Sequence, residues 1–151
     1  MIGGILHYEH GFAENIYDYD SLKDKKFDLV FMGQVIEHIE KDKLSLVLKW
    51  IREHLAKDGR FIFDTPNRLL TKIQSFDSFI DPDHKYEYEP DELKKIIEDN
   101  GFKVIKENGI LDMPNTLKTK VFDPLEVLKT EYFNNNPQTS YLFAFETIVK
   151  D

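Results

Sequence analysis

Three polar side chains able to do acid–base or ligand chemistry stand close together in the first third of the chain: Gln34, Glu37 and His38. Spacings of three and four residues would place all three on one helical face. A carboxylate beside an imidazole can take a proton from a nucleophile or ligate a divalent cation. Because Gln34 brings no charge, only two strong ligands remain, and we predict no metal site. The alternative is that Glu37 and His38 brace a loop through hydrogen bonds.

A second polar set follows the apolar segment Arg60–Phe63 and could line a substrate pocket: Asp64, Thr65 and Asn67. Asn67 could equally be a turn former. Farther on, Ser75–Glu89 is rich in Asp, Pro and aromatic residues, which is typical of a loop or lid. Its His84 and Tyr86 either form a wall over a substrate or are incidental residues of an exposed loop.

Two strands and a helix must position these residues. The apolar run Phe27–Met32 indicates a strand that is covered on both faces. Apolar residues at spacings of three and four then predict an amphipathic helix over 44–55, ended by Gly59 in a left-handed conformation. Arg60–Thr65 predicts a second strand. Strand, helix and strand in this order imply a right-handed crossover and parallel pairing.

The strand ends should carry the site, because ligands bind beyond the carboxyl ends of strands in open α/β sheets. Met32, Gly33 and Gln34 stand at such an end. Gly33 has no side chain and would allow a ligand to approach the backbone closely. The alternative is that the segment is a plain turn between a strand and a helix.

The rest of the chain continues the α/β pattern without a domain boundary. We therefore predict that residues 1–151 form one domain with about five strands. The remaining expected elements are a short strand Ile5–Tyr8, a helix over 91–99 with Pro90 in its first turn, a strand Phe102–Glu107, a helix within Val121–Phe133 and a strand Tyr141–Val149. Leu142 and Ala144 should share one face of this last strand, with Phe143 and Phe145 on the other.

Composition excludes several classes of function. A net charge of −8 argues against binding to a nucleic-acid backbone, which needs clustered Lys and Arg. The chain has no cysteine, so disulfides and thiolate metal sites are excluded, and a reducing cytoplasm is favoured. No apolar run approaches the ~20 residues of a membrane span. No basic leader precedes His7, so the sequence does not favour a secretory signal.

Four segments together resemble a known family. They are Gly11–Glu14, Phe27–Val30 with Glu37-His38, the run Asp58–Asn67, and His84 followed by Tyr88–Leu93 and Asn100–Phe102. In this order and spacing they are similar to the class I S-adenosylmethionine-dependent methyltransferases of small-molecule type, in the ubiquinone and menaquinone branch. The resemblance covers roughly residues 10–105.

The resemblance implies a partial Rossmann-like α/β sheet, mostly parallel with an antiparallel C-terminal strand and with helices on both faces. It implies S-adenosylmethionine as cofactor, a small-molecule acceptor, and His38 and Glu37 as catalytic residues. The implied cofactor-binding residues are Phe12, Ala13, Glu14, Met32, Gly33 and Gln34. The implied substrate-binding residues are Asp64, Thr65, Asn67, His84 and Tyr86. A similar Glu-x-x-Glu-His group binds a divalent metal in the ubiquinone branch, but Gln34 replaces its first Glu here.

The chain departs from the family at its front. It lacks the glycine-rich cofactor turn and the acidic residue that binds the ribose, so it resembles a member that begins near the third strand. Strand 27–32 would then be an apolar open edge, which proteins rarely leave bare. We therefore expect that Ile5–Tyr8, a second copy of this chain or a partner chain covers it. The alternative function is a non-catalytic methyltransferase-like module that binds a partner chain.

Overall fold

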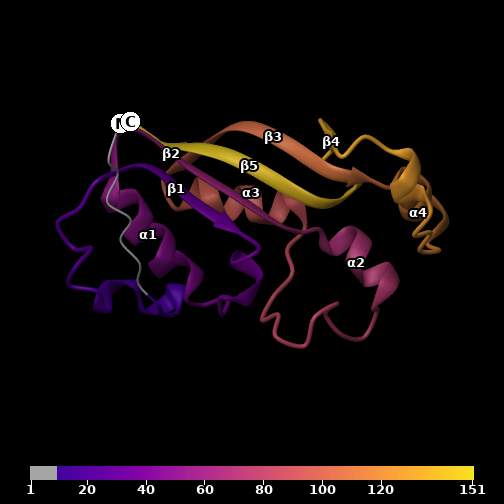
Figure 1. Cartoon of the computed structure of the whole chain (residues 1–151), viewed down its shortest axis with the longest axis horizontal. Coiled ribbons are helices and arrows are strands. Elements are labelled where there is room, and N and C mark those ends of the chain that lie inside the picture. Colours follow the sequence, from indigo (N-terminus) through magenta and orange to yellow (C-terminus); the bar gives the residue numbers. More distant parts are fainter. Residues whose placement is uncertain (1–9) are drawn as a thin grey trace, which may run out of the picture.

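One mixed five-stranded sheet runs through residues 10–151, which are the residues that the structure, a computed structural model, describes (Figure 1). The strand order is β1-β2-β5-β3-β4. The strands are β1 (Phe27–Gly33), β2 (Leu55–Pro66), β3 (Phe102–Asp112), β4 (Phe133–Asn134) and β5 (Ser140–Val149). The α/β class and the four longer strands are as the sequence predicts, and the expected strand Ile5–Tyr8 lies outside the described residues.

The strand pairs combine one parallel ladder with three antiparallel ladders. β1 and β2 are parallel, with Val30 opposite Phe61, as predicted. β5 is antiparallel to both β2 and β3, and β4 is antiparallel to β3. β1, β2 and β3 therefore run in one direction, but β5 separates β2 from β3. For this reason the expectation of mostly parallel pairing is wrong, whereas the antiparallel C-terminal strand is confirmed.

The two longest helices, α1 (Leu44–His54) and α3 (Pro90–Asp99), pack on the same face of the sheet. Their apolar stripes join the inward side chains of the strands in one core, which includes Leu48, Ile51, Leu93, Ile97, Phe61, Phe63, Phe102, Phe143 and Phe145. The expectation of helices on both faces is wrong for this pair. The β1-to-β2 and β2-to-β3 crossovers advance across the sheet in the same direction, so right-handed connections place both helices on one side.

The opposite side of the sheet carries an apolar surface that we call the open face: Leu29, Phe31, Ile62 and Leu142. These residues alternate with core residues along their strands. Leu29 is 55% exposed and Phe31 is 62% exposed. Within residues 10–151, β1 pairs only with β2 and so forms the edge of the sheet. The expected cover for this edge stays a prediction.

Gly59 does not end α1, contrary to the sequence prediction. The helix stops at His54, and Gly59 lies inside β2 without a positive φ. A Cβ atom at Gly59 would lie 2.9 Å from the backbone oxygen of Phe27. The glycine is therefore needed because two backbones approach closely at the start of the parallel pair, not because a helix needs a left-handed end.

The helix predicted within Val121–Phe133 is present only as one short 3₁₀ helix, because Pro124 interrupts the pattern. The chain instead forms α4 (Pro114–Thr119) and a short 3₁₀ helix, Glu126–Lys129. The Glu126 carboxylate accepts from the backbone N–H groups of Asn115 (2.7 Å) and Thr116 (2.9 Å) at the start of α4. Burial alone would raise the pKa of Glu126, but these N–H groups lower it overall.

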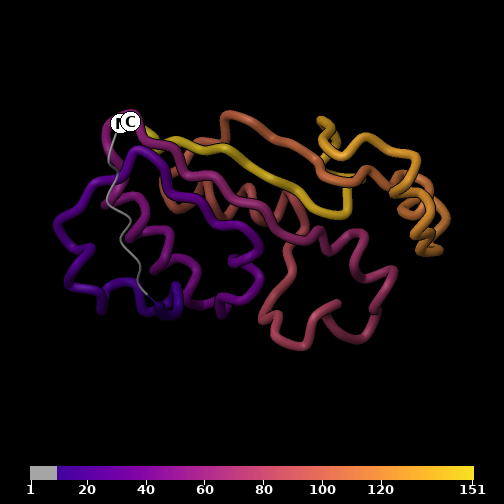
Figure 2. Tube along the Cα trace, in the orientation of Figure 1, coloured from indigo at the N-terminus to yellow at the C-terminus, as the bar shows by residue number. Residues whose placement is uncertain are grey.

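Two long loop segments lie on the helix-covered side of the sheet (Figure 2). Residues 10–26 run beneath α1 and include the 3₁₀ helix Ala13–Asp18. Residues 75–89 leave α2 (Arg68–Gln74) and return to α3 without forming a helix, as the sequence predicts for this loop. Among residues 10–151, the helices all fall short of the length and apolar character needed to cross a bilayer.

Candidate active site

The parallel strands β1 and β2 end side by side, and the first two candidate residues pair there. The backbone N–H and the side-chain amide of Gln34 donate to Asp64 Oδ1 at 2.9 and 2.8 Å. Gln34, rather than Gly33, takes the left-handed conformation, with a φ of 53°. Gln34 therefore faces Asp64 and does not share a helical face with Glu37.

Glu37 is a buried carboxyl group with one unpaired oxygen. It lies in the 3₁₀ helix Ile36–His38 and is 0% exposed. Thr65 Oγ1 donates to its Oε2 at 2.9 Å, whereas Oε1 has no partner among residues 10–151. Burial is the main cause that raises the pKa of Glu37. A buried carboxyl oxygen without a hydrogen-bond donor costs folding free energy unless a ligand or a cation contacts it.

Loop 75–89 brings a third residue to this carboxyl group. The backbone N–H groups of Lys85 and Tyr86 donate to the Glu37 backbone oxygen and hold the loop against it. The rings of His38 and His84 then meet edge to face, with centroids 4.8 Å apart. One ligand atom from each of Glu37, His38 and His84 lies within 4.8 Å of the others. We call these three residues the triad.

The triad changes the argument about metal ions. The sequence prediction of no metal rests on two strong ligands, and His84 adds a third from a distant segment. His38 Nδ1 lies 3.3 Å from the Asp83 carbonyl oxygen, which can only accept, so in the neutral ring this contact favours the proton on Nδ1 and the lone pair on Nε2. Two imidazoles with one carboxylate form a donor set that divalent transition metals accept. The unpaired Glu37 Oε1 fits the same requirement.

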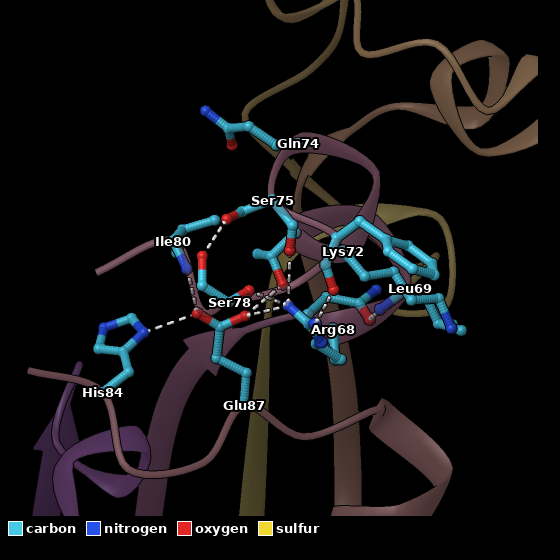
Figure 3. A network of polar contacts seen from close by, with 12 residues as sticks. Arg68, Leu69, Lys72, Gln74, Ser75, Ser78, Ile80, His84 and Glu87 are labelled. Atoms are coloured by element: carbon cyan, nitrogen blue, oxygen red, sulfur yellow. Dashed lines mark hydrogen bonds and ion pairs between the residues drawn. The ribbon is translucent and has the colours of Figure 1, made fainter. Parts of the chain in front are cut away.

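A buried polar network fixes His84 from behind (Figure 3). His84 Nδ1 lies 2.7 Å from Glu87 Oε1, and the Glu87 side chain is 0% exposed. Glu87 also accepts hydrogen bonds from Thr71, the Ile80 backbone and Arg68. Sequence reasoning missed Glu87, although its spacing of three residues from His84 was a usable signal.

Two hollows lie against segments that carry candidate residues, and the second of them includes a member of the triad, His84. The first, of about 330 Å³, is lined by Gly11, Phe12, Ala13, Ile16, Tyr19, Leu22 and Val35. The second, of about 410 Å³, is lined by Ser78, Phe79, Asp81, Pro82 and His84. The predicted cofactor residues Phe12 and Ala13 thus border one hollow, and the predicted substrate residue His84 borders the other. Glu14 does not line either.

The structure places three predicted site residues elsewhere. Met32 is 9% exposed and belongs to the core. Asn67 is fully buried, and its amide groups bond to backbone atoms on both sides. Tyr86 donates its hydroxyl to Glu92, and the Lys41 ammonium lies over its ring. In the structure these three side chains make packing and bracing contacts, and their predicted roles in binding stay predictions. Thr65 is also fully buried and reaches the site only through Glu37.

The raised pKa of Glu37 predicts a specific dependence of stability on pH. Glu37 keeps its proton to a higher pH in the folded protein than in the unfolded chain. As the pH rises from the pKa that Glu37 has in the unfolded chain to the higher pKa that it has in the folded protein, the contribution of Glu37 to the free energy of unfolding therefore falls. Glu37→Gln removes this fall because an amide does not titrate. We therefore expect the variant to gain stability relative to wild type with rising pH, as measured by urea unfolding.

The exposed Glu40 offers a matched control for that measurement. Glu40→Gln should follow the wild-type curve closely. Parallel wild-type and Glu37→Gln curves across the acid range would contradict the prediction.

One comparison with known proteins identifies a family, and another shows likeness of fold. A family model described as a methyltransferase domain matches residues 5–107. No curated protein matches the chain. Among solved structures, an S-adenosylmethionine-dependent methyltransferase from Thermotoga maritima, described as a possible histamine N-methyltransferase, is 18% identical with a TM-score of 0.63, over 93% of this chain and 62% of that one. One from Archaeoglobus fulgidus is 19% identical with a TM-score of 0.62, over 91% and 65%.

A third, from Clostridium acetobutylicum, is 13% identical with a TM-score of 0.53, over 85% of this chain and 60% of that one. At these identities the likeness concerns the fold. The chain spans between 60% and 65% of the length of these three solved relatives.

Proposed function

Since this chain belongs to the methyltransferase-domain family, we propose that it is the acceptor-side part of an S-adenosylmethionine-dependent methyltransferase that acts on a small molecule. The observation that carries this proposal is the position of the triad. It stands beyond the ends of two parallel strands, where open α/β sheets bind ligands, and its His84 lines the second hollow. One hollow would take part of the cofactor and the other the acceptor.

The cofactor side is supported by the apolar lining of the first hollow. Phe12 and Ala13 border it, and Val35 connects it to the strand end that carries Gln34. A flat apolar group such as an adenine ring suits such a lining. Residues 10–151 supply no glycine-rich turn, so the remainder of the cofactor would need contacts from outside this hollow.

The chemistry asked of the chain is modest. In methyl transfer the bond between the sulfonium sulfur and the methyl carbon breaks while the acceptor atom bonds to that carbon. A hydroxyl acceptor gives up its proton as it attacks, whereas an amine attacks in its neutral form and loses a proton after it has taken the methyl group. His38 Nε2 carries a free lone pair at an exposed position and is the proposed base. Orientation of the two reactants supplies the rest of the rate enhancement.

The triad also fits a divalent cation, as the unpaired Glu37 Oε1 and the close approach of the three ligand atoms indicate. Glu37, His38 and His84 would hold it, and His38 Nε2 would then act as a ligand instead of as the base. When bound, such an ion supplies positive charge that favours the ionised form of an acceptor hydroxyl.

The open face supports one alternative function, a non-catalytic module that binds a partner chain. Leu29 and Phe31 form an exposed apolar surface on the edge strand. Exposed apolar edges tend to pair with another chain. The same surface could be covered in an active enzyme by a second copy or a partner, so cofactor binding is the property that separates the two functions. For either one, we propose a cytoplasmic location, on the absence of cysteine.

Isothermal titration of the chain with S-adenosylhomocysteine tests the proposal. Because the chain lacks the glycine-rich turn, we expect weak binding, and a dissociation constant in roughly the micromolar range or tighter would favour the enzyme. Ala13→Trp should abolish it by filling the first hollow, whereas Ser78→Trp fills the second hollow and should leave it unchanged. Absence of binding by wild type, together with a stable oligomer in analytical ultracentrifugation, would favour the module instead.

A further inference from the structure

The two ring nitrogens of His84 face different surroundings. Nδ1 lies 2.7 Å from a Glu87 carboxylate oxygen, on the buried side of the loop. The ring also meets the His38 ring edge to face, and one ligand atom of His84 lies within 4.8 Å of ligand atoms of Glu37 and His38. The His84 side chain is 6% exposed, so packing restricts rotation of the ring. Which nitrogen carries the proton therefore decides whether His84 offers the triad a lone pair or an N–H group.

Glu87 settles that choice because its hydrogen-bonding capacity is filled by donors. Its Oε1 accepts from the Ile80 backbone N–H at 2.9 Å, beside His84 Nδ1. Its Oε2 accepts from the Thr71 hydroxyl and from Arg68. A carboxylate that accepts these bonds has no proton to give to an imidazole nitrogen. The short contact with Nδ1 is therefore a hydrogen bond only if Nδ1 carries the proton.

We propose that Glu87 is a positioning residue that holds the proton of His84 on Nδ1 and presents Nε2 as a bare lone pair to Glu37 and His38. The proposal deepens the proposed function, since it concerns the same triad. It does not depend on methyl transfer or cofactor binding. The lone pair of His38 is fixed in the same sense by the Asp83 carbonyl oxygen, so both imidazoles would present lone pairs to one point.

Nitrogen-15 NMR of the histidine side chains of the whole chain tests this directly, at a pH where neutral imidazole dominates. We expect wild-type His84 to show a protonated Nδ1 and a bare Nε2. In Glu87→Gln the amide can donate as well as accept, so the Nδ1–H form should give way to a mixture. Thr71→Val is the matched control: it removes another partner of Glu87 but leaves the contact with His84, so the tautomer should not change.

Either of two results would overturn the proposal. One is a wild-type His84 with the proton on Nε2, a result that needs no variant to fold. The other is a folded Glu87→Gln protein in which Nδ1–H stays fully populated.

A second arm uses Mn²⁺ alone, titrated calorimetrically. Loss of a partner that orients a metal-binding histidine typically weakens binding by about 10- to 100-fold. We expect that loss in Glu87→Gln and much less in Thr71→Val. Equal affinity in wild type and Glu87→Gln would overturn the role of Glu87. If wild type binds no Mn²⁺, the cation part of the proposed function fails, while the tautomer measurement still decides the role of Glu87.

Discussion

Replacing Asn67 by alanine is expected to lower the free energy of unfolding by about 3 kcal/mol. Asn67 Oδ1 accepts from the Leu69 backbone N–H at 3.0 Å and so caps the start of α2. Its Nδ2 donates to the backbone oxygens of Pro137 (3.0 Å) and Ser140 (2.9 Å). Loss of the cap costs about 1 kcal/mol, and buried carbonyl groups left without donors account for the rest. Chemical denaturation measures the change.

Asn67→Asp separates the two contributions. The aspartate keeps the capping oxygen but replaces the donor with an acceptor that faces two carbonyl oxygens, so it should be no more stable than Asn67→Ala. Asn100→Ala is the matched control, because Asn100 makes a single bond to a helix carbonyl, Ile96 O, at 2.8 Å. It should cost only about 1 kcal/mol. A wild-type-like Asn67→Asp would show that capping alone matters.

Replacing Arg68 by alanine should have a comparable effect, concentrated in loop 75–89. The guanidinium group donates to the backbone oxygens of Ser75, Phe76 and Ser78 and to the buried Glu87 carboxylate. Removing it takes the arginine charge away from the buried Glu87 carboxylate, which keeps its other donors, and breaking a buried ion pair in this way costs about 3 kcal/mol. We expect rapid proteolysis within the loop and faster hydrogen exchange there, before the core strands lose protection.

Arg60→Ala provides the matched control for this prediction. Arg60 pairs with Glu146 at 3.1 Å, but the two side chains are 41% and 30% exposed. Exposed pairs contribute about 1 kcal/mol or less, so this variant should remain close to wild type. Equal cleavage of the loop in the two variants would refute the special role of Arg68.

The elements that depend on local pattern were predictable from sequence. The stripe of α1, Pro90 at the start of α3 and the alternation along β5 each identify an element correctly, and the parallel pairing of β1 with β2 follows from their connection. Gly59 was misread because a glycine after a helix pattern also suits a close approach of two backbones. Only the paired register of β1 and β2 distinguishes the two uses.

The candidate site was predictable as a set of residue types but not as a geometry. Glu37 and His38 are adjacent in sequence, whereas His84 joins them only because loop 75–89 folds back onto the Glu37 backbone. The helical spacing suggested Gln34 as a companion, but a left-handed turn at that residue directs it to Asp64. Long-range placement of this kind leaves no periodic signal in the sequence.

The placement of β5 has a consequence for how the chain acquires its structure during synthesis. β5 follows every other strand in sequence yet lies between β2 and β3, and Thr147 bonds to Phe61 across a separation of 86 residues. The position between β2 and β3 therefore has no strand until residues 140–149 have left the ribosome. Such high contact order slows folding. The late synthesis of β5 also leaves the facing edges of β2 and β3 unpaired on nascent chains. We therefore expect chaperones to bind these nascent chains.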